Sequence, residues 1–273
     1  MIENVKKILL VASGKGGVGK STVATNLAQA LSKSGHVTGL VDVDIYGPSL
    51  PTMLGAVDPP KTDGKKIYPA KKFGLKLMSI GYMVEPEQAL VWRGPMLAGA
   101  ALQLFNDVDW GTLDYLVVDL PPGTGDIQLS LSQQLKVTGA VLVTTPQQVA
   151  VADVVRAKAM FDKVRISSLG VVENMSHFIA PDTGTRYDIF GSGGGERVAA
   201  DLEIPLIGRI PIEPAVRECG DGGEPVVRAY PNSDSARAFM ALAEEVDLLA
   251  QAAAEAREKK ERGRSILPII GGG

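Results

Sequence analysis

The sequence predicts a doubly wound α/β fold with a mostly parallel sheet, and three observations lead to this expectation. Short apolar runs recur along the 273 residues, and helical stretches lie between them. The runs are apolar throughout instead of alternating, which is typical of parallel strands covered on both faces. The first run meets a glycine-rich turn that opens the first helical pattern, as in strand-loop-helix units.

The predicted elements follow one another in a regular order. A strand over residues 8–12 precedes a helix over residues 21–34 whose apolar residues share one face. Gly35 ends this helix, and a second strand over residues 37–43 completes a βαβ unit with a right-handed crossover. Further strands are predicted at residues 115–118, 140–144, 169–172 and 206–210, and further helices at residues 147–161 and 196–201.

Two segments interrupt this order. Residues 61–79 contain Lys, Gly and Pro with short alternating runs, so we expect a β-hairpin inserted at the sheet edge. Residues 176–195 are rich in Gly, Asp and Thr, which predicts an exposed loop excursion.

The chain is predicted to form a single domain over residues 1–250, followed over residues 251–273 by a charged C-terminal helix and a flexible tail. Length alone would also permit two smaller domains. Within the helical stretch, Glu255 and Lys259 have the i, i+4 spacing that supports a solvated helix. The apolar face is missing past Ala254, so we expect no membrane binding through this helix.

Composition narrows the functional classes. Apolar residues make up 45% and charged residues 22% of the chain, as in ordinary globular proteins. The net charge of -3 does not support a globally basic nucleic-acid binder, and no apolar run approaches the roughly 18 residues that span a bilayer. The start lacks a signal-peptide pattern, so a cytoplasmic protein is expected. Cys219 is the single cysteine, which excludes an internal disulfide and a Cys-rich metal site built by one chain.

The strongest motif is a phosphate-binding loop between the first predicted strand and the first helix. It consists of Gly14, Lys15, Gly16, Gly17, Val18, Gly19, Lys20 and Ser21, and Thr22 follows it. Glycines let backbone N–H groups converge on phosphate oxygens, and the helix N-terminus adds its positive dipole end. Lys20 would hold the β and γ phosphates of ATP, Ser21 would bind magnesium, and Thr22 the α phosphate. The motif favours a sheet of the P-loop NTPase type; the alternative is a glycine turn that binds nothing.

Acidic residues close the neighbouring predicted strands. Asp119 follows residues 115–118 and is placed like the carboxylate that holds magnesium in P-loop NTPases. Asp42 and Asp44 end the second strand, where a carboxylate can touch the metal shell or orient the attacking water. Each aspartate alone is more often a turn or cap residue, but their joint placement favours a catalytic edge. Residues 121–126 form a Pro-Gly-rich loop suited to a γ-phosphate switch, or else a rigid turn.

Several motifs together resemble a known family. Lys15 resembles the additional lysine of the deviant Walker A motif in the MinD/ParA class of P-loop ATPases. Residues 41–49 (VDVDIYGPS), 92–95 (WRGP) and 119–126 (DLPPGTGD) resemble the Mrp/ApbC family of iron-sulfur cluster carriers. Residues 173–176 and 187–191 continue the match, which runs from about residue 5 to about residue 250.

This resemblance implies a homodimer that binds ATP, ADP and magnesium, hydrolyses ATP, and serves an apo iron-sulfur client or assembly protein. Lys15 would reach across the dimer to the partner's nucleotide, Asp44 would position the attacking water, and both would act with Lys20 in catalysis. Asn174 resembles the adenine-reading asparagine, and Pro211 lies where the class packs a loop on the adenine. The alternatives are that Asn174 forms a turn and that Pro211 ends a strand.

The sequence departs from the family at the cluster ligands. The family carries a Cys-x-x-Cys pair in the loop after Asn174, whereas this chain reads APDT at residues 180–183. Clusters require soft thiolates, which alanine and threonine do not supply, so the usual cluster site is absent. Cys219 could serve as a ligand in a dimer, but its two copies would supply only two thiolates. The alternative is that Cys219 has no ligand role and is a small side chain in a turn. The second functional candidate is therefore a MinD/ParA-type nucleotide-dependent switch that recruits a protein partner without cluster chemistry. A third is an adaptor with the same fold that uses residues 177–190 as a partner-docking surface.

Overall fold

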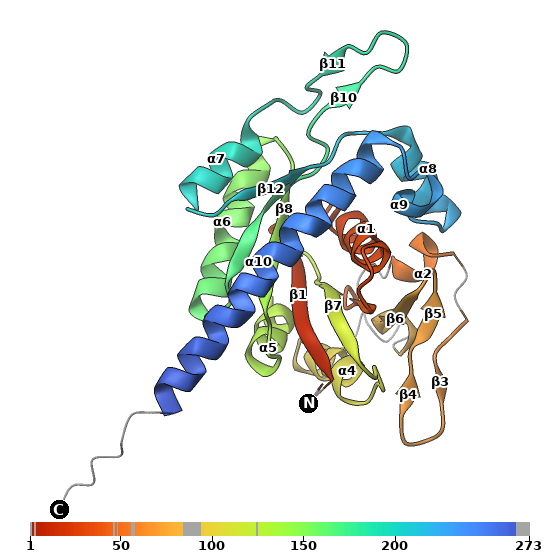
Figure 1. Ribbon diagram of the computed structural model, residues 1–273, viewed down its shortest axis with the longest axis vertical. Coiled ribbons are helices and arrows are strands. Elements are labelled where there is room, and N and C mark those ends of the chain that lie inside the picture. Colours follow the sequence, from red (N-terminus) through yellow and green to blue (C-terminus); the bar gives the residue numbers. More distant parts are fainter. Residues whose placement is uncertain are drawn as a thin grey trace, which may run out of the picture.

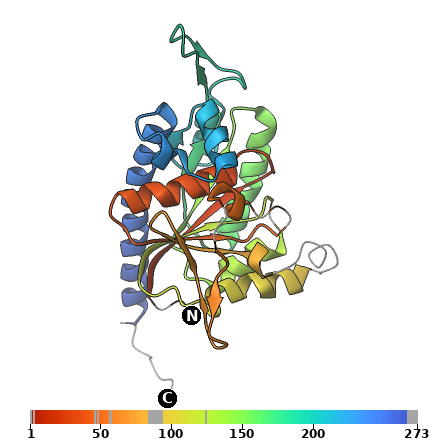
Figure 2. The same cartoon turned by 90° about the vertical axis from the view of Figure 1, so that its right-hand side faces the viewer.

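The computed structural model describes residues 2, 4–45, 47, 49–55, 58–83, 94–123 and 125–265. Within them, an eight-stranded sheet lies between two layers of helices, as Figure 1 and Figure 2 show. All neighbouring strands run parallel except β5 and β6, which confirms the predicted fold class. The strand order is β12 (Leu206–Arg209), β9 (Ser168–Glu173), β8 (Gly139–Thr144), β1 (Val5–Ser13), β7 (Leu113–Asp119), β2 (Thr38–Asp42), β6 (Leu75–Ser79) and β5 (Ala70–Lys72).

The strands are apolar throughout because helices cover both faces of the sheet. Leu9 and Val11 of β1 pack into one helical layer and Leu10 into the other, and all three are fully buried. The first layer contains α1 (Lys20–Lys33), α2 (Leu50–Met53), α8 (Pro214–Gly222), α9 (Val226–Ala229) and α10 (Asp234–Ser265). The second layer contains α4 (Gly94–Asn106), α5 (Asp126–Gln134), α6 (Gln148–Lys163) and α7 (Gly194–Asp201).

Strand β1 occupies the position at which the winding of the sheet reverses. It pairs with β7 on one side and with β8 on the other. The chain leaves β1 through α1 toward β2, and it later builds the other half of the sheet outward from β8. In open α/β sheets, ligands bind at the carboxyl ends of the strands beside such a switch point. The segment that directly follows β1 is therefore where the fold places a ligand.

The segment over residues 61–79 contains the predicted hairpin at the sheet edge, β5 and β6, and a second pair of strands that was not expected. β3 (Lys61–Thr62) and β4 (Ile67–Tyr68) form a small separate pair, and β5 then turns back on β6 at the sheet edge. The additional feature is that β6 pairs parallel with β2 and leads into the short 3-10 helix η1 (Ile80–Tyr82). Leu75 and Leu77 are buried beneath α1, so β6 belongs to the core rather than to an appended hairpin.

The predicted excursion over residues 176–195 is a projecting arm. β10 (Phe178–Ile179) and β11 (Arg186–Tyr187) form an antiparallel hairpin that extends away from the body of the molecule (Figure 1). The N-terminus of α7 follows it and returns the chain to the second helical layer.

The C-terminal helix α10 is continuous across residue 250. Phe239, Leu242 and Val246 are buried against the layer that contains α1, whereas the end of the helix runs past the sheet (Figure 1). The division into a domain and a C-terminal extension at residue 250 stays a prediction, and residues 266–273 lie outside the described part. None of the helices in the described ranges combines the length and the apolar character that crossing a membrane requires.

Candidate phosphate-binding site

Three parallel strands bring the predicted motifs to one edge of the sheet. Val11 of β1 lies beside Asp119 of β7, and Asp119 lies beside Asp42 of β2. The glycine-rich loop that follows β1 therefore shares its edge with the strand-end carboxylates. The loop after β7 is attached to the same place, because the Gly123 N–H donates to the Ser13 carbonyl at 3.0 Å.

The backbone of the loop is shaped by glycine. Gly17 and Gly19 have φ values of 81° and 80°, a left-handed conformation that side chains disfavour. Gly14 packs so closely on α6 that an added Cβ would lie 2.1 Å from the carbonyl carbon of Asp153. Gly16 and Gly17 instead face open space. The loop is thus fixed on one side and accessible on the other.

Helix α1 begins at Lys20 with its first N–H groups available. Its N-cap residue is Gly19, no side chain caps the end, and the first turn contains no acidic residue. Unpaired N–H groups together with the helix dipole favour an anion at such an end. The loop and α1 can therefore hold a phosphate without competition from a carboxylate cap.

Lys20 is the charged centre of the site. Its side chain is 6% exposed, and its Nζ lies 2.5 Å from Oδ1 of Asp119 and 3.9 Å from Oδ2 of Asp44. Burial raises the pKa of Asp119, while the Lys20 ammonium and a hydrogen bond with Ser21 act in the opposite direction. Oδ1 of Asp44 is buried and has no hydrogen-bond partner within the described residues. A buried lysine between two carboxylates is poised to exchange one of them for a phosphate.

Asp42 uses its carboxylate differently from the other two aspartates. Its Oδ1 accepts from the Asp44 N–H at 3.0 Å, and its Oδ2 accepts from the N–H groups of Ser49 at 3.0 Å and Leu50 at 3.2 Å. The Ser79 hydroxyl also donates to Oδ2 at 3.3 Å. Burial, and next the charge of Asp119, raise the pKa of Asp42 to about 7. Asp42 therefore holds the start of α2 and the end of β6 together.

Lys15 has no ionic partner within the described residues. It is half-buried, and its carbonyl accepts from the Ser13 hydroxyl at 2.9 Å. No ion pair of its ammonium occurs in the described part of the chain. Thr22 lies one position into α1 beyond Ser21 and is held by the Asn26 amide, which donates to its carbonyl at 3.0 Å.

The two residues with an expected adenine role differ in their contacts. Asn174 follows β9, and its Nδ2 donates to the carbonyl of Val18 at 2.8 Å. Pro211 is buried beyond β12, next to Ile210, whose N–H donates to the Glu173 carbonyl at 2.9 Å.

Gln128 is a residue of this edge that the sequence motifs did not single out. It is fully buried on α5, and its amide donates to the carbonyl of Pro121 in the Pro-Gly-rich loop. Its position directly after that loop was the only signal that could have indicated it.

Several motif residues fall outside the described structure. Tyr46, Pro48, Trp92, Arg93 and Thr124 are among them, so their expected contributions stay predictions.

The hairpin arm has no thiol, and Cys219 lies elsewhere. Ala180 and Thr183 are at the hairpin turn, where the Ala180 N–H donates to the Thr185 carbonyl at 2.9 Å. Cys219 is in α8, buried in the layer that contains α1, and its pKa is raised by burial and then by nearby glutamates. Among the described residues, no group of three or more His, Cys, Asp or Glu side chains is arranged to hold a metal ion.

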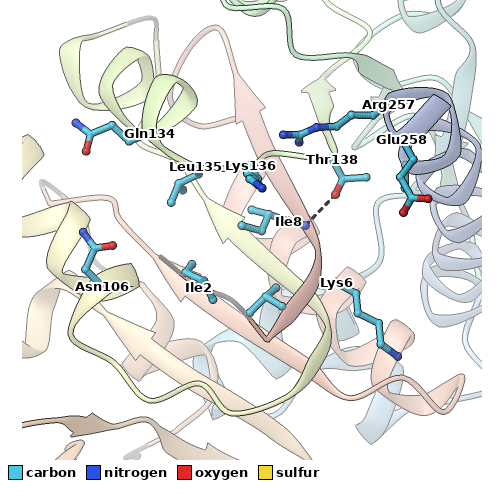
Figure 3. Close-up of a pocket in the computed structure, with 12 residues that line it drawn as sticks. Ile2, Lys6, Ile8, Asn106, Gln134, Leu135, Lys136, Thr138, Arg257 and Glu258 are labelled. Atoms are coloured by element: carbon cyan, nitrogen blue, oxygen red, sulfur yellow. Dashed lines mark hydrogen bonds between the residues drawn. The ribbon is translucent and has the colours of Figure 1, made fainter. Parts of the chain in front are cut away.

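A separate cavity opens at the opposite edge of the sheet. It has a volume of about 420 Å³ and is lined in part by Lys6, Thr138 and Arg257 (Figure 3). The Ile8 N–H donates to the Thr138 hydroxyl at 3.1 Å on its wall. Because it lies at the amino end of β1 and the loop lies at the carboxyl end, this cavity is distinct from the phosphate site.

The strand, the glycine-rich loop, the uncapped helix and the buried lysine beside strand-end carboxylates define the chain as a P-loop NTPase. The family model described as "ParA: NUBPL iron-transfer P-loop NTPase" matches residues 4–247. The chain belongs to this family, as its sequence motifs indicated.

Individual relatives agree with this assignment. An iron-sulfur cluster carrier protein from Synechocystis is 49% identical over 251 residues, which are 90% of this chain and 71% of that protein. A nucleotide-binding protein from Archaeoglobus fulgidus, solved in complex with ADP, is 35% identical with a TM-score of 0.75 over 87% of this chain and 93% of that one. The septum site-determining protein MinD from Pyrococcus horikoshii, solved with Mg-ADP, is 27% identical with a TM-score of 0.70 over 90% of this chain and 98% of that one.

Proposed function

We propose that this chain is a magnesium-dependent ATPase that works as a homodimer and assists iron-sulfur protein maturation without holding a cluster on its own hairpin. The observation that carries the proposal is the buried Lys20 at the uncapped N-terminus of α1, with Asp119 and Asp44 beside it. A buried cation among backbone donors recognises the β and γ phosphates of a nucleotide.

The mechanism follows from the charges in the site. Water attacks the γ phosphate in line, and Lys20 offsets the charge on the transferring group. Asp44 orients the water, because its buried Oδ1 has no partner within the described residues and can accept a hydrogen bond. Lys20 bonds to Asp119 at 2.5 Å, so phosphate binding requires the ammonium to share or exchange this partner.

Oxygen ligands suitable for magnesium lie at the same edge. Magnesium bound with nucleotides uses one or two protein oxygens together with phosphates and waters. The hydroxyl of Ser21 and the carboxylate of Asp119, whose pKa Ser21 helps to lower, would hold it. Asp42 fits this role less well because its oxygens already accept three backbone N–H groups. When bound, magnesium neutralises charge on the β and γ phosphates.

Dimerisation would complete the site through Lys15. The half-buried Lys15 has no ion pair within the described chain, which supports a role toward the nucleotide of a second copy. A lysine that serves the other chain makes hydrolysis depend on assembly, because neither subunit then has the full set of cations.

The hairpin arm does not fit direct cluster transport. Its turn carries Ala180 and Thr183, which lack thiolates, and Cys219 is buried on another element. Iron in clusters is held by thiolates in nearly all sites. The cluster is therefore the cargo of a partner protein, and this chain supplies the nucleotide cycle.

Phosphate release from ATP tests the enzymatic part. We expect slow turnover that requires magnesium and whose rate per chain rises with protein concentration. The proposal fails if purified protein with magnesium takes up no adenine nucleotide in calorimetry.

Anaerobic reconstitution with iron and sulfide tests the hairpin. The double variant Ala180→Cys/Thr183→Cys restores the family's thiol spacing and provides the matched control. We expect cluster absorption in the double variant and none in the unmodified chain. Stoichiometric iron and sulfide in unmodified dimers would show that the chain carries a cluster directly, against the proposal.

A second candidate function is a nucleotide-dependent switch that recruits a protein without any link to clusters. The exposed apolar residues of the arm favour it: Ile179, Tyr187 and Ile189 are 39%, 52% and 56% exposed. The two candidates differ in one assay. The first predicts that the chain with ATP and magnesium speeds activation of an apo iron-sulfur enzyme by a separate cluster donor, and the second predicts no effect.

A further inference from the structure

The side chain of Asn174 contacts the glycine-rich loop directly. The Asn174 side chain is buried, and its Nδ2 donates to the Val18 carbonyl at 2.8 Å across 156 positions of sequence. A Cβ built on Gly19 would lie 2.2 Å from the same Nδ2 and 3.7 Å from Cε of Met175. The turn after β9 therefore packs directly on the backbone that opens α1.

The backbone of Asn174 is held by the sheet. Its main-chain N–H donates to the Thr144 carbonyl of β8 at 2.8 Å. On the other side, the Ser176 N–H donates to the Ile210 carbonyl at 2.9 Å. Both bonds tie the turn to neighbouring strands of the sheet. The position of Asn174 relative to the loop is thus set by the sheet and not by a mobile side chain alone.

This contact has a consequence for the loop's phosphate-facing groups. The carbonyl of Val18 and the N–H of Gly19 belong to one planar trans peptide, so they point in opposite directions. When Asn174 holds the carbonyl, the Gly19 N–H is turned away from β9. A carbonyl rotated toward the phosphates would instead repel them.

We infer that Asn174 is a positioning residue of the nucleotide site, which fixes the Val18–Gly19 peptide so that its N–H serves the phosphates. The inference rests on the proposed nucleotide binding. It is separate from the adenine-reading role that the family resemblance implies, because the bond to Val18 uses one Nδ2 hydrogen on the loop backbone, whereas base reading would use the second hydrogen or Oδ1. The two roles predict different things: a base contact separates adenine from guanine, whereas a held peptide supports the phosphates of both.

The test compares nucleotide affinities of the full chain. Dissociation constants for ATP and GTP with magnesium are measured by calorimetry for the unmodified chain and for Asn174→Ala. One hydrogen bond contributes about a factor of ten, so we expect both affinities to fall about tenfold with the ATP to GTP ratio unchanged. Gln29→Ala is the matched control. Gln29 is also a buried amide, but it lies on α1 and donates to the Phe73 carbonyl at 3.3 Å instead of to the glycine-rich loop. It should lower the melting temperature without changing either affinity.

A double-mutant cycle measures the coupling between Asn174 and Gly19 in nucleotide affinity, which general destabilisation of the fold does not change. Gly19→Ala places a Cβ against Nδ2 of Asn174, and truncating Asn174 removes that clash. The loss of affinity caused by Gly19→Ala should therefore be smaller in the Asn174→Ala background than in the unmodified chain.

Each other outcome has a defined meaning. Loss of ATP affinity alone, with GTP unaffected, would overturn the inference in favour of base reading. Unchanged affinities for both nucleotides, or strictly additive effects in the cycle, would also overturn it. If the unmodified chain binds neither nucleotide, the proposed function itself fails before any variant is compared.

Discussion

Nζ of Lys20 lies 2.5 Å from Oδ1 of Asp119, and both side chains are almost completely buried. The pair joins the first turn of α1 to the end of β7, and its two residues are 99 positions apart in the sequence. Removing one partner of a buried pair is costly because the other charge is left without compensation. The same pair is the point at which a γ phosphate would enter the site.

Lys20→Ala should abolish useful nucleotide binding. We expect affinity for ATP to fall by about 100-fold or more, because charged hydrogen bonds contribute more than neutral ones. Stability should fall by about 3 kcal/mol because Asp119 becomes unpaired. Calorimetry and urea denaturation measure the two effects. Lys33→Ala is the control, since Lys33 lies at the other end of the same helix and donates to the Val227 carbonyl. Near-normal ATP binding by Lys20→Ala would contradict the proposal that Lys20 binds the nucleotide phosphates.

Lys15→Ala should separate binding from turnover. Because Lys15 has no ion pair within its described chain, we expect nucleotide affinity to stay within about threefold. Turnover should fall by about 100-fold and lose its dependence on protein concentration, as expected for a removed transition-state contact. Phosphate release measured across a concentration series tests this. Unchanged turnover would show that the cross-dimer role is wrong.

Asp44→Ala should retain ATP but hydrolyse it slowly. Asp44 lies 3.9 Å from Lys20, whereas Asp119 keeps the closer contact, so the lysine remains anchored in the variant. Loss of the group that orients water should lower turnover by about 100-fold or more. Single-turnover kinetics with bound ATP measure this step. Loss of ATP binding instead would assign Asp44 to metal binding or folding.

Asp247 should stabilise the fold in a pH-dependent way through the attachment of α10. Its carboxylate accepts from the Tyr115 hydroxyl and lies 3.5 Å from Nζ of Lys7. Burial acts to raise the pKa of Asp247, but these contacts lower it overall. A lowered pKa gives stability that is present above the unfolded value of about 3.9 and is lost as pH falls through the folded value. Asp247→Asn should therefore cost about 1 kcal/mol at pH 7, with the difference shrinking toward pH 3.

Denaturation curves at several pH values test the role of Asp247. Asp162→Asn is the control, because its pair with Lys158 is on the exposed surface of α6 and should contribute little. A cost for Asp247→Asn that does not change between pH 7 and pH 3 would mean that packing, not charge, is responsible.

Cys219 should be slow to react with thiol reagents. Burial and neighbouring glutamates raise its pKa, so the thiolate is scarce at neutral pH. We expect iodoacetamide labelling of the native chain to be far slower than that of urea-unfolded chain at pH 8. Mass spectrometry gives both rates. Equal rates would show that Cys219 is accessible in the native chain, and Cys219 would again be a candidate cluster ligand.

The fold was largely predictable because its signals are local. Buried parallel strands require continuous apolar runs, and each such run became a strand of the sheet. β6 was predicted only as part of an edge hairpin, because Lys76 and the flanking glycine-bearing segment give no continuous apolar run. Only its burial against β2 and α1 made it a core strand.

The sequence by itself determined the phosphate loop, since Gly14 to Ser21 form one contiguous segment whose backbone needs are met by local residue types. The tertiary structure alone decided how distant side chains are used. Asp42 holds α2, and Asn174 reaches Val18 across 156 positions of sequence. Such partners depend on which strands become neighbours, and that is decided by packing of the whole sheet rather than by any pattern within one segment.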